Sequence, residues 1–265
     1  MTKLAFLGAG NIAQAIIGGL IATGFKPDDI CASDPYSEQL KKLTAIGVQT
    51  SVNNIDAIQG ADVVILSVKP DVVESICTEI SPVAAGKLFI SVAAGITATS
   101  LKTWLDSSTI IRCMPNTPAL VKKGMTGLFA TSAVSAEQRK VADTILSAVG
   151  ETLWFDEEAK LDAVTAISGS GPAYFFYVIE VMQEAALAAG LSTEESSKLV
   201  LQTALGASEM ALQSTEPTAE LRRKVTSPGG TTAAALEVLQ QEGIDSIFLK
   251  AVTAAKKRSE ELSNS

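Results

Sequence analysis

The 265-residue chain is long enough for one large domain or two ordinary ones, and a hydrophobic content of 47% provides for a buried core. With 21 Lys and Arg against 29 Asp and Glu, its net charge of −8 disfavours nucleic acid and anionic membranes as partners. The absence of histidine excludes imidazole bases, His-activated nucleophiles and the usual zinc ligand. Three cysteines far apart in sequence predict no disulfide framework and no metal site, and they fit a reducing cytoplasm.

The N-terminal residues predict a strand, a tight turn and a helix. Residues 3–7 are an apolar run, Gly-Ala-Gly follows, and apolar residues then recur at helical spacing. Lys3 before an apolar run is also typical of a signal peptide, but glycines and polar residues soon interrupt the run. No stretch of about 18 apolar residues occurs, so we expect a soluble chain without a membrane span.

The stretch "LGAGNIA", residues 7–13, has the spacing of a dinucleotide-binding turn. Gly8 permits the tight turn, Gly10 lets a pyrophosphate approach the backbone, and Ala13 takes the place of the third glycine. A glycine turn alone is weak evidence. Because this one follows a strand and opens a helix, it predicts a bound dinucleotide.

The second strand ends in "CASDPY", which places Ser33 and Asp34 where the adenosine ribose would lie. An acid there usually accepts from the ribose 2′-hydroxyl and repels the 2′-phosphate of NADP. Ser33 and Asn54 are possible donors to that phosphate. The choice between NAD and NADP stays open on these residues, and Asp34 is alternatively the N-cap of the next helix.

Further apolar strands are expected at residues 61–68, 87–94 and 108–114, with helical patterns between them. This alternation predicts a parallel sheet with helices on both faces. Two more strands, "GMTGLFAT" and "ETLWF", flank a helix that starts with a capping box of Ser135 and Gln138.

Two strand ends add small or polar groups at the edge where open α/β sheets bind ligands. "SVKP" follows the strand at 61–68, and Lys69 there is either a ligand contact or a solvated loop lysine. "SVAAG" ends the next strand, and Ala94 suits either a nicotinamide ring or tight packing.

After about residue 156 every segment reads as helix, including one with a capping box of Ser192 and Glu195. A domain boundary is expected near residues 155–162. The helix at 173–190 is apolar around most of its circumference, which predicts packing against a second copy of the chain, or else full enclosure within one chain.

The stretch "VTSPGGTTAAALEVLQ", residues 225–240, breaks this helical region with a turn and restarts a helix at once. Free N–H groups at a helix start bind anions, and the glycine pair lets a ligand approach. The alternative is a plain helix connection with Thr as N-cap.

Four blocks in this order, "LGAGNIA", "IRCMPNTPALVKKGMTGLFA", "DAVTAISGSGPAYFF" and "VTSPGGTTAAALEVLQ", resemble the pyrroline-5-carboxylate reductase family over essentially the whole chain. The resemblance implies an α/β N-terminal Rossmann-like domain (1–158) plus an all-α C-terminal dimerisation and substrate-binding domain (159–265). It implies NAD(P)H-dependent reduction of pyrroline-5-carboxylate to L-proline. It also implies a homodimer with the active site at its interface, often assembled into a decamer.

The motifs and the resemblance together give two sets of site residues. NADP(H), with NAD(H) as a second cofactor, is expected against Gly8, Ala9, Gly10, Asn11, Ile12, Ser33, Asp34, Asn54, Ser67, Val68, Lys69, Pro70 and Ala94. Substrate is expected against Glu158, Gly230, Thr231 and Thr232. Asp34 stands where some relatives have Ser, which bears on the preference for NADP.

The expected chemistry needs no histidine. The N–H groups of Gly230 and Thr231 would hold the substrate carboxylate, and the Thr232 hydroxyl, the expected catalytic group, would bond the ring nitrogen. A cyclic imine is basic enough to accept hydride as an iminium. The alternatives are a related reductase of another imine or keto acid, and a non-catalytic dinucleotide-binding regulator. The intact "SPGGTT" favours the enzyme.

Overall fold

The computed structural model describes residues 2–263, which form two compact units. The first unit contains the described residues up to Ser170 together with those from Ala255 onward, and the second is Gly171–Ala254. The chain therefore leaves the first unit and returns to it at the end of its last helix. The units divide at residues 170 and 254, whereas the sequence places a single boundary near 158.

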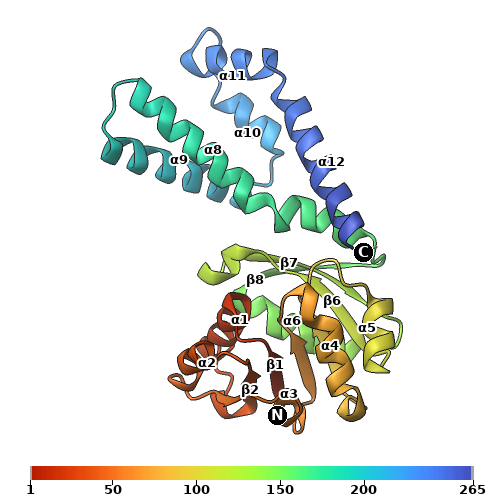
Figure 1. The fold of residues 1–265 in the computed structure, drawn as a ribbon. Helices are drawn as coiled ribbons and strands as arrows, with labels where there is room; N and C mark the ends of the chain where they lie inside the picture. The colour runs from red at the N-terminus through yellow and green to blue at the C-terminus, as the bar shows by residue number, and fades with distance from the viewer. Residues whose placement is uncertain (1, 264–265) are drawn as a thin grey trace. The chain divides into compact units, whose positions relative to one another are not determined.

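The first unit is built on an eight-stranded sheet in the order β3-β2-β1-β4-β5-β6-β7-β8 (Figure 1). Its strands are β1 (Leu4–Leu7), β2 (Ile30–Ser33), β3 (Gln49–Ser51), β4 (Val63–Leu66), β5 (Leu88–Ser91), β6 (Ile110–Met114), β7 (Gly124–Ala130) and β8 (Gly150–Phe155). All neighbouring pairs are parallel except β6 and β7. The expected Rossmann-like sheet is confirmed, with one antiparallel pair toward its β8 end and with β3 as an edge strand that the sequence pattern missed.

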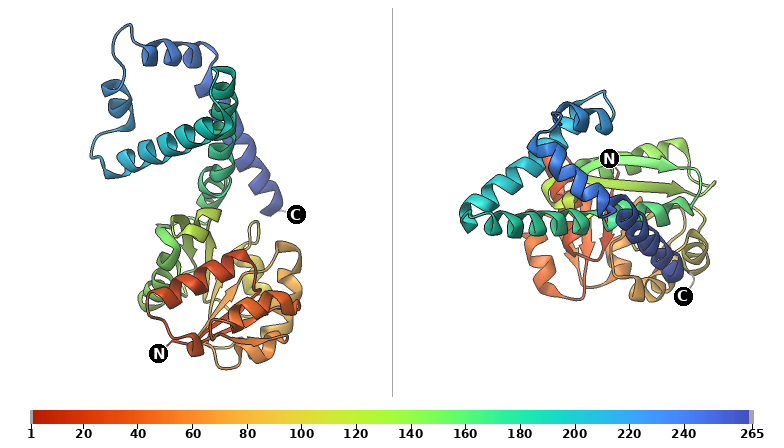
Figure 2. Two further views of the ribbon diagram at one scale, coloured as in Figure 1. Left: turned by 90° about the vertical axis from the view of Figure 1, so that its left-hand side faces the viewer. Right: turned by 90° about the horizontal axis from the view of Figure 1, so that it is seen from above.

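Helices cover both faces of this sheet. They are α1 (Asn11–Ala22), α2 (Ser37–Thr44) and α6 (Ala136–Leu146) on one face, and α3 (Asn54–Ile58), α4 (Pro70–Ile80) and α5 (Ala98–Leu105) on the other. Side chains alternate along β1, so Leu4 and Phe6 join one core and Ala5 and Leu7 the other. Figure 2 shows α1, in red, lying across its face in the left-hand view. The near-continuous apolar strands thus reflect burial on both faces.

The chain after β8 is helical, as expected. Its helices are α7 (Lys160–Val164), a π-helical turn (Thr165–Gly169), α8 (Gly171–Ala188), α9 (Thr193–Gln213), α10 (Thr218–Lys224), α11 (Thr231–Gln241) and α12 (Ile244–Ser263). Both predicted capping boxes are present, at the start of α6 and of α9. The second unit is a helical hairpin of α8 and α9 followed by shorter helices and most of α12.

The end of α12 belongs to the first unit through specific contacts. The buried Ser259 hydroxyl donates to Asp162 Oδ1 of α7 at 2.7 Å. An ideal Cβ built on Gly95 would lie 3.2 Å from the Leu262 carbonyl oxygen. The last turns of the chain therefore pack against the loop that follows β5.

Candidate active site

Three parallel strands bring their carboxyl ends to one edge of the sheet. Leu7 pairs with Leu66, and Leu66 with Ser91, so β1, β4 and β5 end level with one another. The ladder continues past the strands, because Ser67 N–H donates to the Leu7 carbonyl and Val92 N–H to the Leu66 carbonyl. The predicted glycine turn, "SVKP" and "SVAAG" therefore lie at the same ligand-binding edge.

The glycine turn fits a pyrophosphate. Gly8 has φ +95°, and a Cβ there would lie 2.5 Å from the Ser67 carbonyl oxygen, so only glycine is accommodated. Gly10 is the N-cap of α1 without a side-chain cap, and a Cβ there would meet nothing within 4 Å. Open space over the positive end of a 12-residue helix is what an anionic group needs, and Asn11 and Ile12 form the first turn beneath it.

Asp34 serves the glycine turn rather than capping α2. Its Oδ2 accepts from Ala9 N–H and its Oδ1 from Tyr36 N–H, both at 2.9 Å. The N-cap of α2 is Tyr36, so the alternative of Asp34 as that cap is wrong. The carboxylate ties the end of β2 to the turn after β1 and sits at the expected ribose position.

Ser33 and Asn54 are joined to each other. The buried Ser33 hydroxyl donates to Asn54 Oδ1 at 2.7 Å, and Asn54 Nδ2 donates to Glu79 Oε2 at 2.9 Å. Glu79, from α4, was not foreseen from the sequence. It orients the Asn54 amide through one N–H of its NH₂ group, and the second N–H of that group is the donor for a 2′-phosphate.

The segment after β4 packs directly on the glycine turn. The Ser67 hydroxyl is within hydrogen-bond distance of the Leu7 and Gly8 carbonyls, at 3.0 and 2.8 Å. Val68 is partly buried, whereas Lys69 is exposed as the N-cap of α4, with Pro70 in the first helical position. The Ser67 hydroxyl thus links two loops, and Lys69 adds an exposed positive charge after β4. Ala94, in the loop after β5, is partly buried.

The predicted anion turn in the second unit has the expected backbone. Gly229 has φ +70°, and α11 starts at Thr231 with Gly230 as its N-cap and no side-chain cap, so the alternative of a Thr N-cap is wrong. The N–H of Gly230 donates to the Ser227 carbonyl at 3.0 Å. In this structure Gly230 therefore shapes the turn, and the N–H groups of Thr231 and Thr232 are the better donors for an anion.

Glu158, expected to meet substrate, forms an ion pair in the first unit. Its Oε1 accepts from Arg112 Nη1 at 2.6 Å and from Ala98 N–H at 2.7 Å. Arg112 comes from β6 and is 8% exposed. The sequence reading missed Arg112, although a single arginine inside the apolar stretch "STIIRCMP" is a signal for a buried charge that needs a partner.

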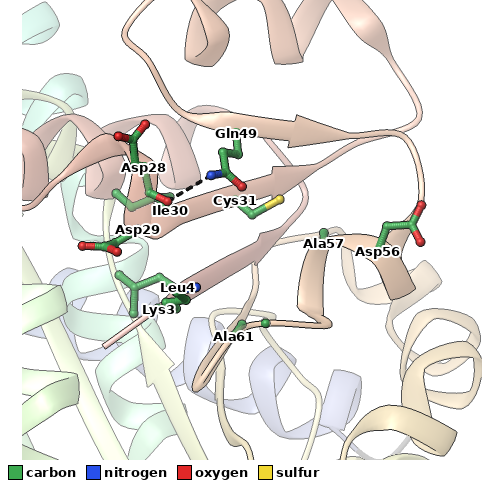
Figure 3. Close-up of a pocket in the computed structure, with 11 residues that line it drawn as sticks. Lys3, Leu4, Asp28, Asp29, Ile30, Cys31, Gln49, Asp56, Ala57 and Ala61 are labelled. Carbon is green, nitrogen blue, oxygen red and sulfur yellow. Dashed lines mark hydrogen bonds between the residues drawn. The ribbon is translucent and has the colours of Figure 1, made fainter. Parts of the chain in front are cut away.

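A separate cavity of about 120 Å³ lies at the opposite edge of the sheet (Figure 3). It is lined by the first residues of three strands, Leu4, Ile30 and Gln49, and the Gln49 amide donates to the Asp28 carbonyl at 3.2 Å. Because ligands of such sheets bind at the carboxyl ends of the strands, this cavity is not the cofactor site.

Over residues 2–263, no helix is long and apolar enough to cross a membrane, and no cluster of His, Cys, Asp and Glu could hold a metal ion.

Two family models match the chain. Residues 158–262 match the pyrroline-5-carboxylate reductase dimerisation domain, and residues 3–95 match the NADP oxidoreductase, coenzyme F420-dependent family. The first match begins one residue before the predicted helical domain, 159–265.

Full-length relatives carry the same family description. The chain is 49% identical to pyrroline-5-carboxylate reductase of Pseudomonas aeruginosa, covering 98% of this chain and 96% of the relative, and 41% identical to that of Pasteurella multocida, covering 98% and 97%. Among solved structures, the reductase of Coxiella burnetii superposes with a TM-score of 0.95 at 41% identity, covering 99% and 98%. That of Plasmodium falciparum, solved with NADP bound, gives 0.88 at 30% identity, covering 99% and 98%.

Proposed function

The chain belongs to the pyrroline-5-carboxylate reductase family, and from that premise we propose how its own residues carry out the reaction. It is an NADP(H)-dependent oxidoreductase that reduces pyrroline-5-carboxylate to L-proline, the last step of proline biosynthesis. The observation that carries this conclusion is 49% identity along 98% of the chain. We assign cofactor binding to residues 1–158, and dimerisation and substrate binding to residues 159–265.

In the cofactor half, the pyrophosphate lies over Gly10 and the first turn of α1, where a Cβ would meet open space. Asp34 and the Ser33–Asn54 pair face the ribose, and Lys69 supplies positive charge at the same edge. The remaining contacts of the predicted set are Ala9, Asn11, Ile12, Ser67, Val68, Pro70 and Ala94. The bound cofactor supplies a hydride, and these residues orient its ring; NAD(H) is accepted less well.

In the substrate half, the start of α11 binds the carboxylate. The N–H groups of Thr231 and Thr232 point out of the helix end, and each charge-assisted hydrogen bond contributes about 1.5 to 3 kcal/mol. The Thr232 hydroxyl donates to the ring nitrogen as electron density builds there. Gly230 keeps the turn compact through its bond to Ser227.

Because a cyclic imine is protonated more readily than a ketone, this chemistry does not require an imidazole acid, which agrees with a chain that contains no histidine. Catalysis then consists mainly of holding the imine carbon in reach of the hydride donor and of excluding water. These two tasks fall to the loops at the sheet edge and to the turn before α11.

The family model that matches residues 158–262 describes a dimerisation domain. Two exposed apolar features support a homodimer. On α8, the side chains of Phe175, Phe176 and Tyr177 are each about two-thirds exposed in the single chain. In the first unit, a cavity of about 420 Å³ is lined by β7, β8, α7 and the π-helical turn, including Leu153 and Ile167. We propose further assembly into a decamer and a cytoplasmic location.

The deciding experiment measures NADPH oxidation at 340 nm with racemic pyrroline-5-carboxylate and identifies proline as the product. NADH is run in parallel, as are a six-membered cyclic imine carboxylate and a keto acid, which test the alternative of a related reductase. Folded protein that binds NADPH but turns over no substrate would support a regulator instead. Sedimentation velocity at micromolar concentration gives the oligomeric state, and a stable active monomer would contradict the dimer.

A further inference from the structure

Glu158 is the meeting point of three elements of the first unit. It lies between β8 and α7, and its Oε1 accepts from Arg112 Nη1 on β6 and from the backbone N–H of Ala98, the first residue of α5. The Glu158 side chain is 27% exposed and that of Arg112 10% exposed. A partly buried carboxylate with a buried guanidinium partner has one fixed geometry, because leaving either charge unpaired is costly.

The Ala98 contact anchors the loop of residues 92–97, which leads from β5 into α5. At its start, Val92 N–H donates to the Leu66 carbonyl, which continues the sheet ladder. At its end, the Thr97 side chain caps α5 by accepting from Ser100 N–H. Glu158 accepts from the N–H of Ala98, the first residue of this helix. A carboxylate at this position is also stabilised by the positive end of α5.

The middle of the same loop is held from another side. Gly95 has φ +76°, and the end of α12 approaches so closely that a Cβ on Gly95 would lie 3.2 Å from the Leu262 carbonyl oxygen. The loop is therefore fixed at the sheet, at the helix start and at its apex. Ala94 is the partly exposed small residue of this loop at the ligand-binding edge, whereas Ala93 is buried in the core.

We propose that Glu158 is a positioning residue, which holds this loop against the reacting ring of the cofactor and does not itself bind substrate. The inference rests on the proposed function, since it takes the loop to be the nicotinamide contact. Arg112 is the second residue of this arrangement: its guanidinium donates to Glu158 Oε1 and holds the carboxylate where it accepts from Ala98 N–H. A loop shift of about 1 Å at the reacting ring is enough to lower the rate about a hundredfold.

The first test is Glu158→Gln, which keeps the size of the side chain and removes its charge. We expect the NADPH dissociation constant to rise several-fold, kcat to fall about tenfold or more and KM for pyrroline-5-carboxylate to stay within twofold. Hydrogen exchange of the peptide spanning residues 92–105 should accelerate. The matched control is Glu157→Gln, whose exposed carboxylate pairs with Lys160 at 3.0 Å and which should leave all four quantities unchanged.

The second variant breaks the link without touching either charge. Ala98→Pro removes the N–H that Glu158 accepts, at the first helical position, where proline is favoured. The preceding residue, Thr97, has φ −79° and ψ 156°, which suits a residue before proline. This variant should reproduce the weaker NADPH binding and the faster exchange, and it decides the question if Glu158→Gln does not fold.

These measurements distinguish a positioning role of Glu158 from direct binding of substrate. A raised KM for pyrroline-5-carboxylate with unchanged NADPH affinity and unchanged exchange would make Glu158 a substrate contact and overturn the proposal. Wild-type values for Ala98→Pro in all measurements would overturn it as well. NADPH binding and hydrogen exchange need no turnover, so they test Glu158 even if the wild-type protein fails to reduce pyrroline-5-carboxylate.

Discussion

The Asp34 carboxylate accepts a hydrogen bond from the backbone N–H of Ala9 at 2.9 Å, so the end of β2 holds the glycine turn in place. Its other oxygen accepts from Tyr36 N–H, so both oxygens already have backbone donors. The residue that is expected to discriminate against a 2′-phosphate is therefore also part of the scaffold of the pyrophosphate site. Substitution should change cofactor preference and stability together.

Asp34→Asn tests this double role. Loss of the negative charge should raise the ratio of kcat/KM for NADPH to that for NADH, because repulsion of the 2′-phosphate disappears. An amide offers only one acceptor oxygen for two N–H donors, so the free energy of unfolding should fall by about 1 to 3 kcal/mol. Steady-state kinetics with both cofactors and urea unfolding measure the two effects. An unchanged ratio would mean that the carboxylate does not reach the ribose.

The two glycines of the turn should respond differently to alanine. Gly8→Ala places a methyl group 2.5 Å from the Ser67 carbonyl oxygen at a positive φ, so we expect marked destabilisation, on the order of several kcal/mol. Gly10→Ala meets open space, so the melting temperature should be nearly unchanged while NADPH binds at least tenfold more weakly. Thermal unfolding and fluorescence titration with NADPH distinguish them. Equal effects of both substitutions on stability would contradict the assignment.

Thr232→Ala should lower kcat about tenfold, which corresponds to roughly 1.4 kcal/mol of stabilisation that arises as charge shifts onto the ring nitrogen. The KM for pyrroline-5-carboxylate should change little, because the backbone N–H groups that hold the carboxylate remain. Thr218→Ala, at the exposed start of α10, is the matched control. If Thr232→Ala keeps wild-type kcat, the turn before α11 only connects two helices.

Two buried thiols should make the folded protein less stable at alkaline pH. Burial raises the pKa of Cys77 and of Cys113 from 9.0 to about 12, and at Cys113 the Arg112 guanidinium opposes the rise. Between pH 9.0 and about 12, these two thiols lose their protons in the unfolded chain but keep them in the folded one. The free energy of unfolding therefore falls as pH rises, by up to about 1.4 kcal/mol per pH unit for each thiol.

Urea unfolding at pH 8.5 and at pH 10.5 measures this loss of stability. Cys113→Ala should reduce the difference between the two pH values, although the cavity lowers stability at both. A difference equal to that of the wild-type protein would show that this thiol does not contribute.

Features that depend on residues close together in sequence could be predicted. Both capping boxes and the turn at 228–230 follow from nearby residues and are confirmed. The predicted strands are present, but β4 ends at Leu66 and β5 at Ser91, before the predicted ends at 68 and 94. Contacts between distant residues were not predictable: Arg112 to Glu158, Asn54 to Glu79 and Asp34 to Ala9 each join separate elements. The short polar strand β3 was missed because it lies at the sheet edge and lacks the apolar pattern of the others.

The return of α12 to the first unit sets an order of events during synthesis. The strands and the cofactor turn leave the ribosome early, but the serine that bonds Asp162 and the carbonyl that packs on Gly95 follow only after the whole second unit has been made. At the usual elongation rates this interval is on the order of ten seconds. Until then the loop after β5 has its anchors at the sheet and at Ala98 but lacks its contact with α12, so the last of its three anchors forms only after the second unit has been made.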